Sequence, residues 1–148
     1  MSELVFCKLG GSVITDKARP GTARHEVIGR LAGEVARSLA SRPELKLVLG
    51  HGSGSFGHVV ARQHGTRHGV GSAREWRGFT EVAAAAARLN RIVTDAMLLA
   101  GVPVLSLQPS ASAECQGGEL ATLAMGPAEH AVALGLVPLV YGDVALDT

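Results

Sequence analysis

The chain has 148 residues and a formal net charge of +1, and 47% of its residues are hydrophobic while 18% are charged. This composition excludes a disordered chain, and no apolar stretch reaches the ~20 residues that a membrane-spanning helix needs. The near-neutral charge gives no electrostatic footprint for nucleic acid, so we expect one globular domain with neither a nucleic-acid nor a membrane partner.

Short apolar runs that end in glycine predict strands at residues 4–9 and 45–49. Between them, apolar residues recur every three or four positions over residues 25–40, which is the period of a helix with one buried face, and Pro43 ends it. The second strand leads into a glycine-rich cluster at residues 50–58. Ser53 or Ser55 within this cluster is a candidate N-cap for a following helix.

The rest of the chain continues this alternation. The patterns predict a helix over 72–99, a strand over 102–107, a helix over 127–134 and a strand over 137–141. Residues 110–123 are ambiguous and are compatible with a hairpin around Gly117 and Gly118. Because strands alternate with helices, the predicted fold class is α/β, with an open, mainly parallel sheet sandwiched by helices.

The two cysteines and the N-terminus bear on the cellular location. Cys7 and Cys115 lie far apart without a metal-binding spacing, so both are expected to be reduced thiols in or near the core. Glu3 and Lys8 interrupt the short apolar run at the N-terminus, which therefore does not resemble a signal peptide. We expect a cytoplasmic protein.

The histidines include one pair with a spacing that metal sites use. His64 and His68 are four residues apart, but neither a third ligand nor an H-E-x-x-H pattern accompanies them, so no metal site is expected. Three other histidines are expected on the surface or in loops, namely His25, His51 and His130.

Three predicted strands end in glycine, at Gly10-Gly11, at residues 50–54 and at Gly142. In open α/β sheets, ligands bind at the carboxyl ends of the strands. Consecutive backbone N–H groups in glycine loops bind anions, particularly next to a helix N-terminus. Two such loops suggest a polyphosphate ligand, although tight turns alone also account for the glycines of any one loop.

The glycine-rich cluster matches G-x-G-x-x-G, a pattern used by several families. A dinucleotide-binding fold needs an acidic residue at the end of the next strand, and Glu75 lies near that distance with no strand before it. A protein kinase needs a downstream lysine, and no lysine follows Lys46. A Walker A loop is absent from the sequence as well.

Three segments taken together point elsewhere. Residues 8–17 read K-L-G-G-S-V-I-T-D-K, residues 51–58 read H-G-S-G-S-F-G-H, and residues 141–147 read Y-G-D-V-A-L-D. In this order they resemble the isopentenyl phosphate kinases of the amino acid kinase superfamily, and the resemblance spans essentially the whole chain. The histidine of G-S-F-G-H is shared with fosfomycin kinases.

The resemblance implies that residues 1–148 form the N-terminal lobe of this fold, which binds the acceptor and its phosphate. It also implies that a C-terminal nucleotide-binding lobe is absent from this chain and that the complete protein is a homodimer. The implied activity is the ATP-dependent conversion of isopentenyl phosphate to isopentenyl diphosphate, a step of isoprenoid biosynthesis. A fosfomycin kinase and a non-catalytic module that binds a phosphate ligand are the alternatives.

Phosphoryl transfer requires in-line positioning of two phosphates and neutralisation of the charge on the transferring group. The resemblance implies that Lys8 contacts the phosphates of ATP, Lys17 stabilises the transition state, and His58 donates a hydrogen bond to the acceptor phosphate. Asp143 would complete the catalytic set by orienting Lys8 through a charge-assisted hydrogen bond. A purely structural role for Asp143 in a turn explains its position nearly as well.

Two further residue sets follow from the resemblance. The acceptor side is assigned Ser53, His58, Thr80 and Gly142. The phosphates of ATP are assigned Lys8, Leu9, Gly10, Gly11, Ser12 and Gly54. Mg²⁺ is expected to arrive with ATP rather than in a protein cage. The helix over 72–99 is the candidate wall of an apolar pocket for the isoprenoid tail. Without a second lobe, we expect weak acceptor binding and little or no kinase activity.

Overall fold

The centre of the structure is a four-stranded sheet with the strand order β1-β2-β6-β3. The computed structural model describes residues 3–148. The strands are β1 (Leu4–Leu9), β2 (Lys46–His51), β3 (Val104–Ser106) and β6 (Val137–Tyr141). All three pairings between neighbouring strands are parallel, which confirms the α/β class. The predicted strands are correct to within two residues at each end.

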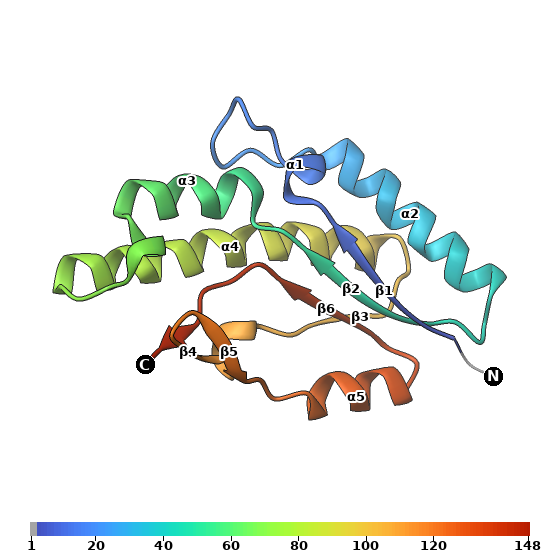
Figure 1. Cartoon of the computed structure of the whole chain (residues 1–148). Coiled ribbons are helices and arrows are strands. Elements are labelled where there is room, and N and C mark those ends of the chain that lie inside the picture. Colours follow the sequence, from blue (N-terminus) through green and yellow to red (C-terminus); the bar gives the residue numbers. More distant parts are fainter. Residues whose placement is uncertain (1–2) are drawn as a thin grey trace.

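Helices cover the two faces of this sheet unequally. They are α1 (Gly11–Ile14), α2 (His25–Ser41), α3 (Gly54–His64), α4 (Ala73–Leu99) and α5 (Gly126–Ala133), with single 3₁₀ turns η1 (Thr66–His68) and η2 (Pro109–Ala111). Helices α2, α3 and α4 lie on one side of the sheet, and only α5 and a small second sheet lie on the other (Figure 1). The one-turn helix α1 falls where the sequence predicted a loop.

The hydrophobic core lies between the sheet and helices α2 and α4. Ile28 of α2, Leu89 of α4 and Leu49 of β2 belong to one cluster and have no exposed surface. The spacing of the apolar residues predicted both helices because one face of each is buried in this cluster.

Helix α4 begins at a capping box. The hydroxyl of Ser72 accepts a hydrogen bond from the backbone N–H of Glu75 at 3.3 Å, and the Glu75 carboxylate accepts the N–H of Ser72 at 2.9 Å. The N–H groups of Gly71 and Ser72 lower the pKa of the Glu75 carboxyl below its usual value. These bonds satisfy N–H groups that the first turn of a helix leaves without partners.

The second sheet contains β4 (Glu114–Gln116), β5 (Glu119–Thr122) and β7 (Leu146–Asp147), in the order β5-β4-β7. Strands β4 and β5 are antiparallel, and Gly117 and Gly118 between them have φ of +59° and +83°. Two positive φ values are typical of the tightest hairpin turns, so the hairpin expected here is confirmed. Strand β7 was not predicted, because two residues carry no periodicity.

One local expectation was wrong, and a second was confirmed only in its position. Cys7 is exposed rather than buried, since β1 is an edge strand of the sheet. Ser53 precedes helix α3 as its N-cap residue, but its hydroxyl makes no capping hydrogen bond. Cys115 is half-buried and also carries a free thiol.

Within residues 3–148, none of the helices is both long and apolar enough to cross a membrane.

Candidate functional site

The three glycine loops predicted from the sequence meet at the carboxyl ends of β1, β2 and β6. The backbone N–H of Gly52 donates to the carbonyl of Leu9 at 3.1 Å, and the N–H of Gly142 donates to the carbonyl of His51 at 2.8 Å. A Cβ atom on Gly11 would lie 2.6 Å from the backbone nitrogen of Gly54. The loops therefore touch backbone to backbone, which only glycine permits at this contact.

Thr15 joins the first loop to the second. Its buried hydroxyl donates to the carbonyl of Gly11 at 2.6 Å and accepts the backbone N–H of Ser55 at 3.0 Å. Gly54 opens helix α3 with φ of +49°. The first turn of α3 therefore lies directly against the loop that follows β1, and N–H groups at a helix N-terminus attract anions.

His51 is buried under these loops, so its expected surface position was wrong. The ring nitrogen Nδ1 lies 2.9 Å from the carbonyl oxygen of Gly52, and Nε2 lies 3.2 Å from Nδ2 of Asn90 in α4. The Oδ1 atom of Asn90 accepts the hydroxyl of Ser106 at 2.6 Å. The ring also stacks on Tyr141, with centroids 5.6 Å apart.

These partners fix the protonation of the His51 ring. A carbonyl oxygen can only accept, so Nδ1 carries the proton, and Nε2 accepts from the Asn90 amide. Burial lowers the pKa of His51 below its usual value, and burial raises the pKa of Tyr141. The strand alternation held the signal for this burial, because Leu47, Leu49 and His51 point to the same buried face of β2.

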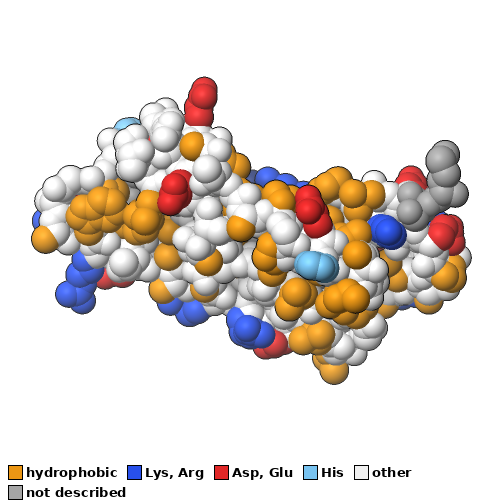
Figure 2. Space-filling view, turned by 90° about the horizontal axis from the view of Figure 1, so that it is seen from below, with side chains coloured by type: hydrophobic (Ala, Val, Ile, Leu, Met, Phe, Trp, Pro, Cys, Tyr) orange, Lys and Arg blue, Asp and Glu red, His pale blue; other side chains and the backbone are white. Residues whose placement is uncertain are grey.

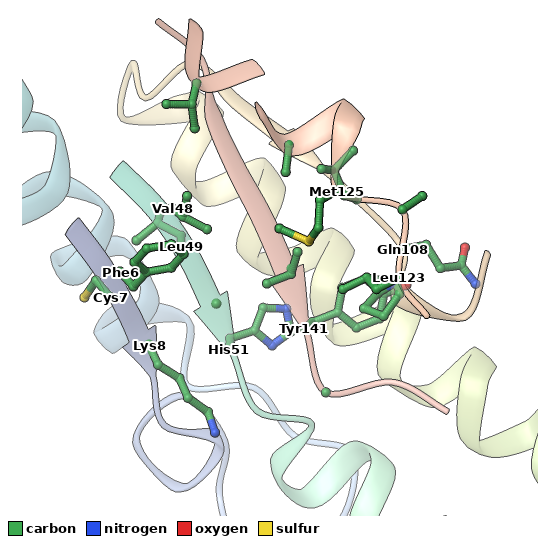
Figure 3. A pocket seen from close by; sticks show the side chains of 18 of the residues that line it. Phe6, Cys7, Lys8, Val48, Leu49, His51, Gln108, Leu123, Met125 and Tyr141 are labelled. Atoms are coloured by element: carbon green, nitrogen blue, oxygen red, sulfur yellow. The ribbon is translucent and has the colours of Figure 1, made fainter. Parts of the chain in front are cut away.

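Lys8 and Lys17 are both exposed. Lys8 is the penultimate residue of β1 and lines a cavity with His51, near the glycine loops (Figure 3). Lys17 lies in the loop between α1 and α2. Asp143 accepts the backbone N–H of Ser110 at 3.0 Å and that of Val144 at 2.9 Å. The turn role of Asp143 is therefore observed, whereas its orientation of Lys8 stays a prediction.

His58 and Thr80 lie on helices beside the loops. His58 is exposed in α3, one turn after Gly54. Thr80 is exposed in α4, where its hydroxyl donates to the carbonyl of Arg77 in the same helix at 2.8 Å. In the described part of the chain, no hydrogen bond or ion pair joins either side chain to the glycine loops. Their roles toward the acceptor stay predictions.

An open, largely apolar cavity of about 810 Å³ occupies the face of the sheet that α5 covers only in part. Phe6 and Val48 of the sheet line it on one side, and Leu123 and Met125 line it on the other (Figure 3). Seen from below, hydrophobic side chains lie exposed along much of this face (Figure 2). Helix α4, the expected apolar wall, does not line this cavity. Of the four residues that suggested the wall, Val82 and Ala86 are buried in the core, whereas Phe79 and Ala83 are half-buried.

The two histidines with metal-like spacing have different neighbours in the structure. His64 contacts Glu81 at 2.8 Å through Nε2, and this hydrogen bond lowers the pKa of the Glu81 carboxyl. His68 instead lines a pocket with Arg62 and Arg67. Over residues 3–148, no group of three or more His, Cys, Asp and Glu side chains is placed to hold a metal ion.

The chain matches the model of the amino acid kinase family over residues 3–148. It is 34% identical to the isopentenyl phosphate kinase of Methanothermobacter thermautotrophicus, covering 98% of this chain and 55% of that protein. It is 40% identical to the isopentenyl phosphate kinase of Haloferax volcanii, covering 95% of this chain and 55% of the relative. The chain therefore spans about half the length of the curated relatives it matches.

Solved structures give the same picture. The chain superposes on an isopentenyl phosphate kinase crystal structure with a TM-score of 0.89 and 34% identity, covering 99% of this chain and 59% of that one. A structure of an isopentenyl phosphate kinase substrate complex matches with a TM-score of 0.82 and 32% identity, over 97% of this chain and 57% of that one. An aspartate kinase from Synechocystis, at 17% identity and a TM-score of 0.65, shares the fold.

Proposed function

Because this chain belongs to the amino acid kinase family, we propose that it is the phosphate-binding lobe of an enzyme that transfers a phosphoryl group from ATP to isopentenyl phosphate. The observation that carries the proposal is the contact between the three glycine loops at the N-terminus of α3. This contact holds the loop after β1 against the N-terminus of α3, and the N-terminus of a helix attracts anions such as phosphates.

The roles of the site residues belong to the same proposal. Gly10, Gly11, Ser12 and Gly54, with the backbone of Leu9, contact the phosphates of ATP, and Lys8 neutralises their charge. Lys17 is an exposed loop residue, and its long side chain reaches the transferring group. A lysine ammonium is a compact point charge on a flexible stem, which suits a group that must follow a moving phosphoryl.

The acceptor lies on the other side of the transferring group. Ser53, Gly142 and Thr80 contact isopentenyl phosphate, and His58 donates a hydrogen bond to its phosphate. The acceptor oxygen is already anionic near neutral pH, so the site needs orientation and charge stabilisation more than a strong base. Asp143 holds the turn after β6 through its two backbone bonds and thereby positions Gly142.

The proposal extends to the partners of the complete protein. Mg²⁺ in kinases binds mainly to substrate phosphates and keeps several waters, so we expect it to enter with ATP and to neutralise phosphate charge. We further propose that the protein acts in the cytoplasm, where ATP is available, and that the complete protein is a homodimer. Light scattering after size-exclusion chromatography measures the oligomeric state.

Binding of isopentenyl phosphate tests the function on the chain itself. We expect calorimetry to show weak binding of isopentenyl phosphate and to show His58→Ala weakening it about tenfold, the loss of one charge-assisted hydrogen bond. The exposed His130 on α5 supplies the control, and His130→Ala should leave binding unchanged.

The fosfomycin kinase alternative predicts a different result. Binding of fosfomycin in place of isopentenyl phosphate would assign the chain to a fosfomycin kinase. Binding of isopentenyl phosphate without any turnover when ATP and Mg²⁺ are added is the result we expect for this chain, which spans about half of its relatives. Failure to bind either acceptor would contradict the proposed function.

A further inference from the structure

A second, smaller pocket of about 240 Å³ lies along helix α3 and the turn that follows it. It is lined by His58, Ala61, Arg62, Gly65, Arg67 and His68. Two of these residues carry guanidinium groups, two carry imidazoles, and no carboxylate lines the pocket. The proposed mechanism uses only His58.

The backbone builds this pocket from two segments. His58, Ala61 and Arg62 are three and four residues apart, so they lie on one side of α3, and the small buried Ala61 leaves room between them. Gly65 ends the helix in the left-handed conformation, with φ of +63°, and η1 follows it directly. This reversal places Arg67 and His68 beside the same stripe of α3.

The two arginines have no acidic partner. In the described part of the chain, neither Arg62 nor Arg67 lies within ion-pair distance of a carboxylate. The two acids of the facing helix that are nearest in sequence are already bonded elsewhere. Glu75 accepts the backbone N–H groups of Gly71 and Ser72, both at 2.9 Å. Glu81 is bonded to His64 at 2.8 Å and to Arg77 at 3.4 Å. The negative C-terminal end of α3 attracts both arginines, but it is only a partial charge and leaves both guanidinium groups without a carboxylate partner.

We propose that this pocket is a second anion-binding site that takes the phosphate group of a small phosphate ester. Arg62 lies eight residues after Gly54, which is ~12 Å along the helix, so an anion held there is separate from the glycine loops. Planar guanidinium groups bind phosphate oxygens in pairs, and Arg62 and Arg67 approach the pocket from two segments. His58 then lies between two anion sites. Its place beside the first of them rests on the proposed function, but the second pocket does not.

Amide shifts in ¹H–¹⁵N spectra test the site with inorganic phosphate as the probe. We expect phosphate to shift the amides of residues 65–69 and expect added salt to weaken this effect. The double variant Arg62→Ala/Arg67→Ala should raise the phosphate concentration for half-saturation at these amides at least about tenfold. The exposed Arg37 on α2 is the control, and Arg37→Ala should change nothing.

Lysine at both positions keeps the charge but removes the paired geometry, so Arg62→Lys/Arg67→Lys should recover part of the affinity. Circular dichroism establishes that each variant is folded. The proposal would be overturned if phosphate did not shift the amides of residues 65–69 in the parent chain. It would also be overturned if phosphate shifted them equally in the double alanine variant.

Titration with isopentenyl phosphate separates this site from the proposed function. Shifts at Gly11, Gly52 and Gly54 without shifts at residues 65–69 would leave the function standing and reject the second site. The opposite result has two parts: phosphate shifts the amides of residues 65–69 in a way that depends on both arginines, and isopentenyl phosphate shifts no amide of the glycine loops. This result would support the second site and reject the proposed function.

Discussion

The two faces of the central sheet differ in how far this chain covers them. Under α2 and α4, Leu49 and Leu139 have no exposed surface, whereas Phe6 on the opposite face is 72% exposed. Strands of parallel sheets are usually apolar on both sides, because helices cover both faces. Here the same strand pattern gives a closed core on one side and an open apolar cavity on the other, so strand hydrophobicity alone does not reveal which face is packed.

Truncating one side chain on each face should give the largest difference. We expect Leu49→Ala to lower the free energy of unfolding by about 2–5 kcal/mol, because it leaves a cavity in the closed core. Phe6→Ala removes a mostly exposed ring and should cost less than about 1 kcal/mol. Urea denaturation of both variants measures this, and equal losses would show that the open face is packed in solution.

The loop contact at the end of the sheet gives the next largest effect. Gly11→Ala should lower the free energy of unfolding by about 1–3 kcal/mol, because its Cβ would collide with the backbone of Gly54. The adjacent Gly10→Ala is the matched control, since its Cβ would meet only Val13 at 3.6 Å. If the two variants unfold at the same urea concentration, the loops are not in contact as described.

The buried imidazole on the closed face should make stability depend on pH. Because burial lowers the pKa of His51, the unfolded chain takes up the proton first as the pH falls. Stability should therefore be retained above about pH 6.5 and fall below it, by at most about 1.4 kcal/mol per pH unit. Thermal midpoints at several pH values should show a smaller slope for His51→Gln and an unchanged slope for the exposed His130→Gln.

The helix that closes the packed face supplies the smallest effect. Ser72→Ala removes the hydroxyl that caps α4 and should cost about 1 kcal/mol, as loss of an N-cap does elsewhere. Ser41→Ala is a suitable comparison, because the Ser41 hydroxyl bonds only within the last turn of α2. A larger loss for Ser41→Ala in urea denaturation would contradict the importance of the capping box.

The sequence was sufficient for the elements whose signals are local. The apolar period of α4 and its stop at Gly101 gave a helix correct to one residue, and Gly117-Gly118 gave the hairpin. Glycine at three strand ends also located the candidate site, because parallel strands bring their carboxyl ends to one edge.

Properties that depend on partners distant in the sequence could not be predicted. The exposure of Cys7 depends on β1 being an edge strand, which no single strand encodes. The burial of His51 depends on Asn90, 39 residues away, whose amide satisfies the ring inside the core. The pocket around Arg62 depends on the chain reversal at Gly65. A single glycine in the sequence does not indicate in which direction the chain turns.

The Thr15 hydroxyl has a consequence for how the glycine loops open. It accepts the Ser55 N–H across 40 residues of sequence, so that amide can exchange its hydrogen with solvent only when the loops after β1 and β2 part. The exchange rate of one backbone amide therefore reports the opening equilibrium of the candidate site directly. A ligand that bridges the two loops would slow this exchange in proportion to its occupancy.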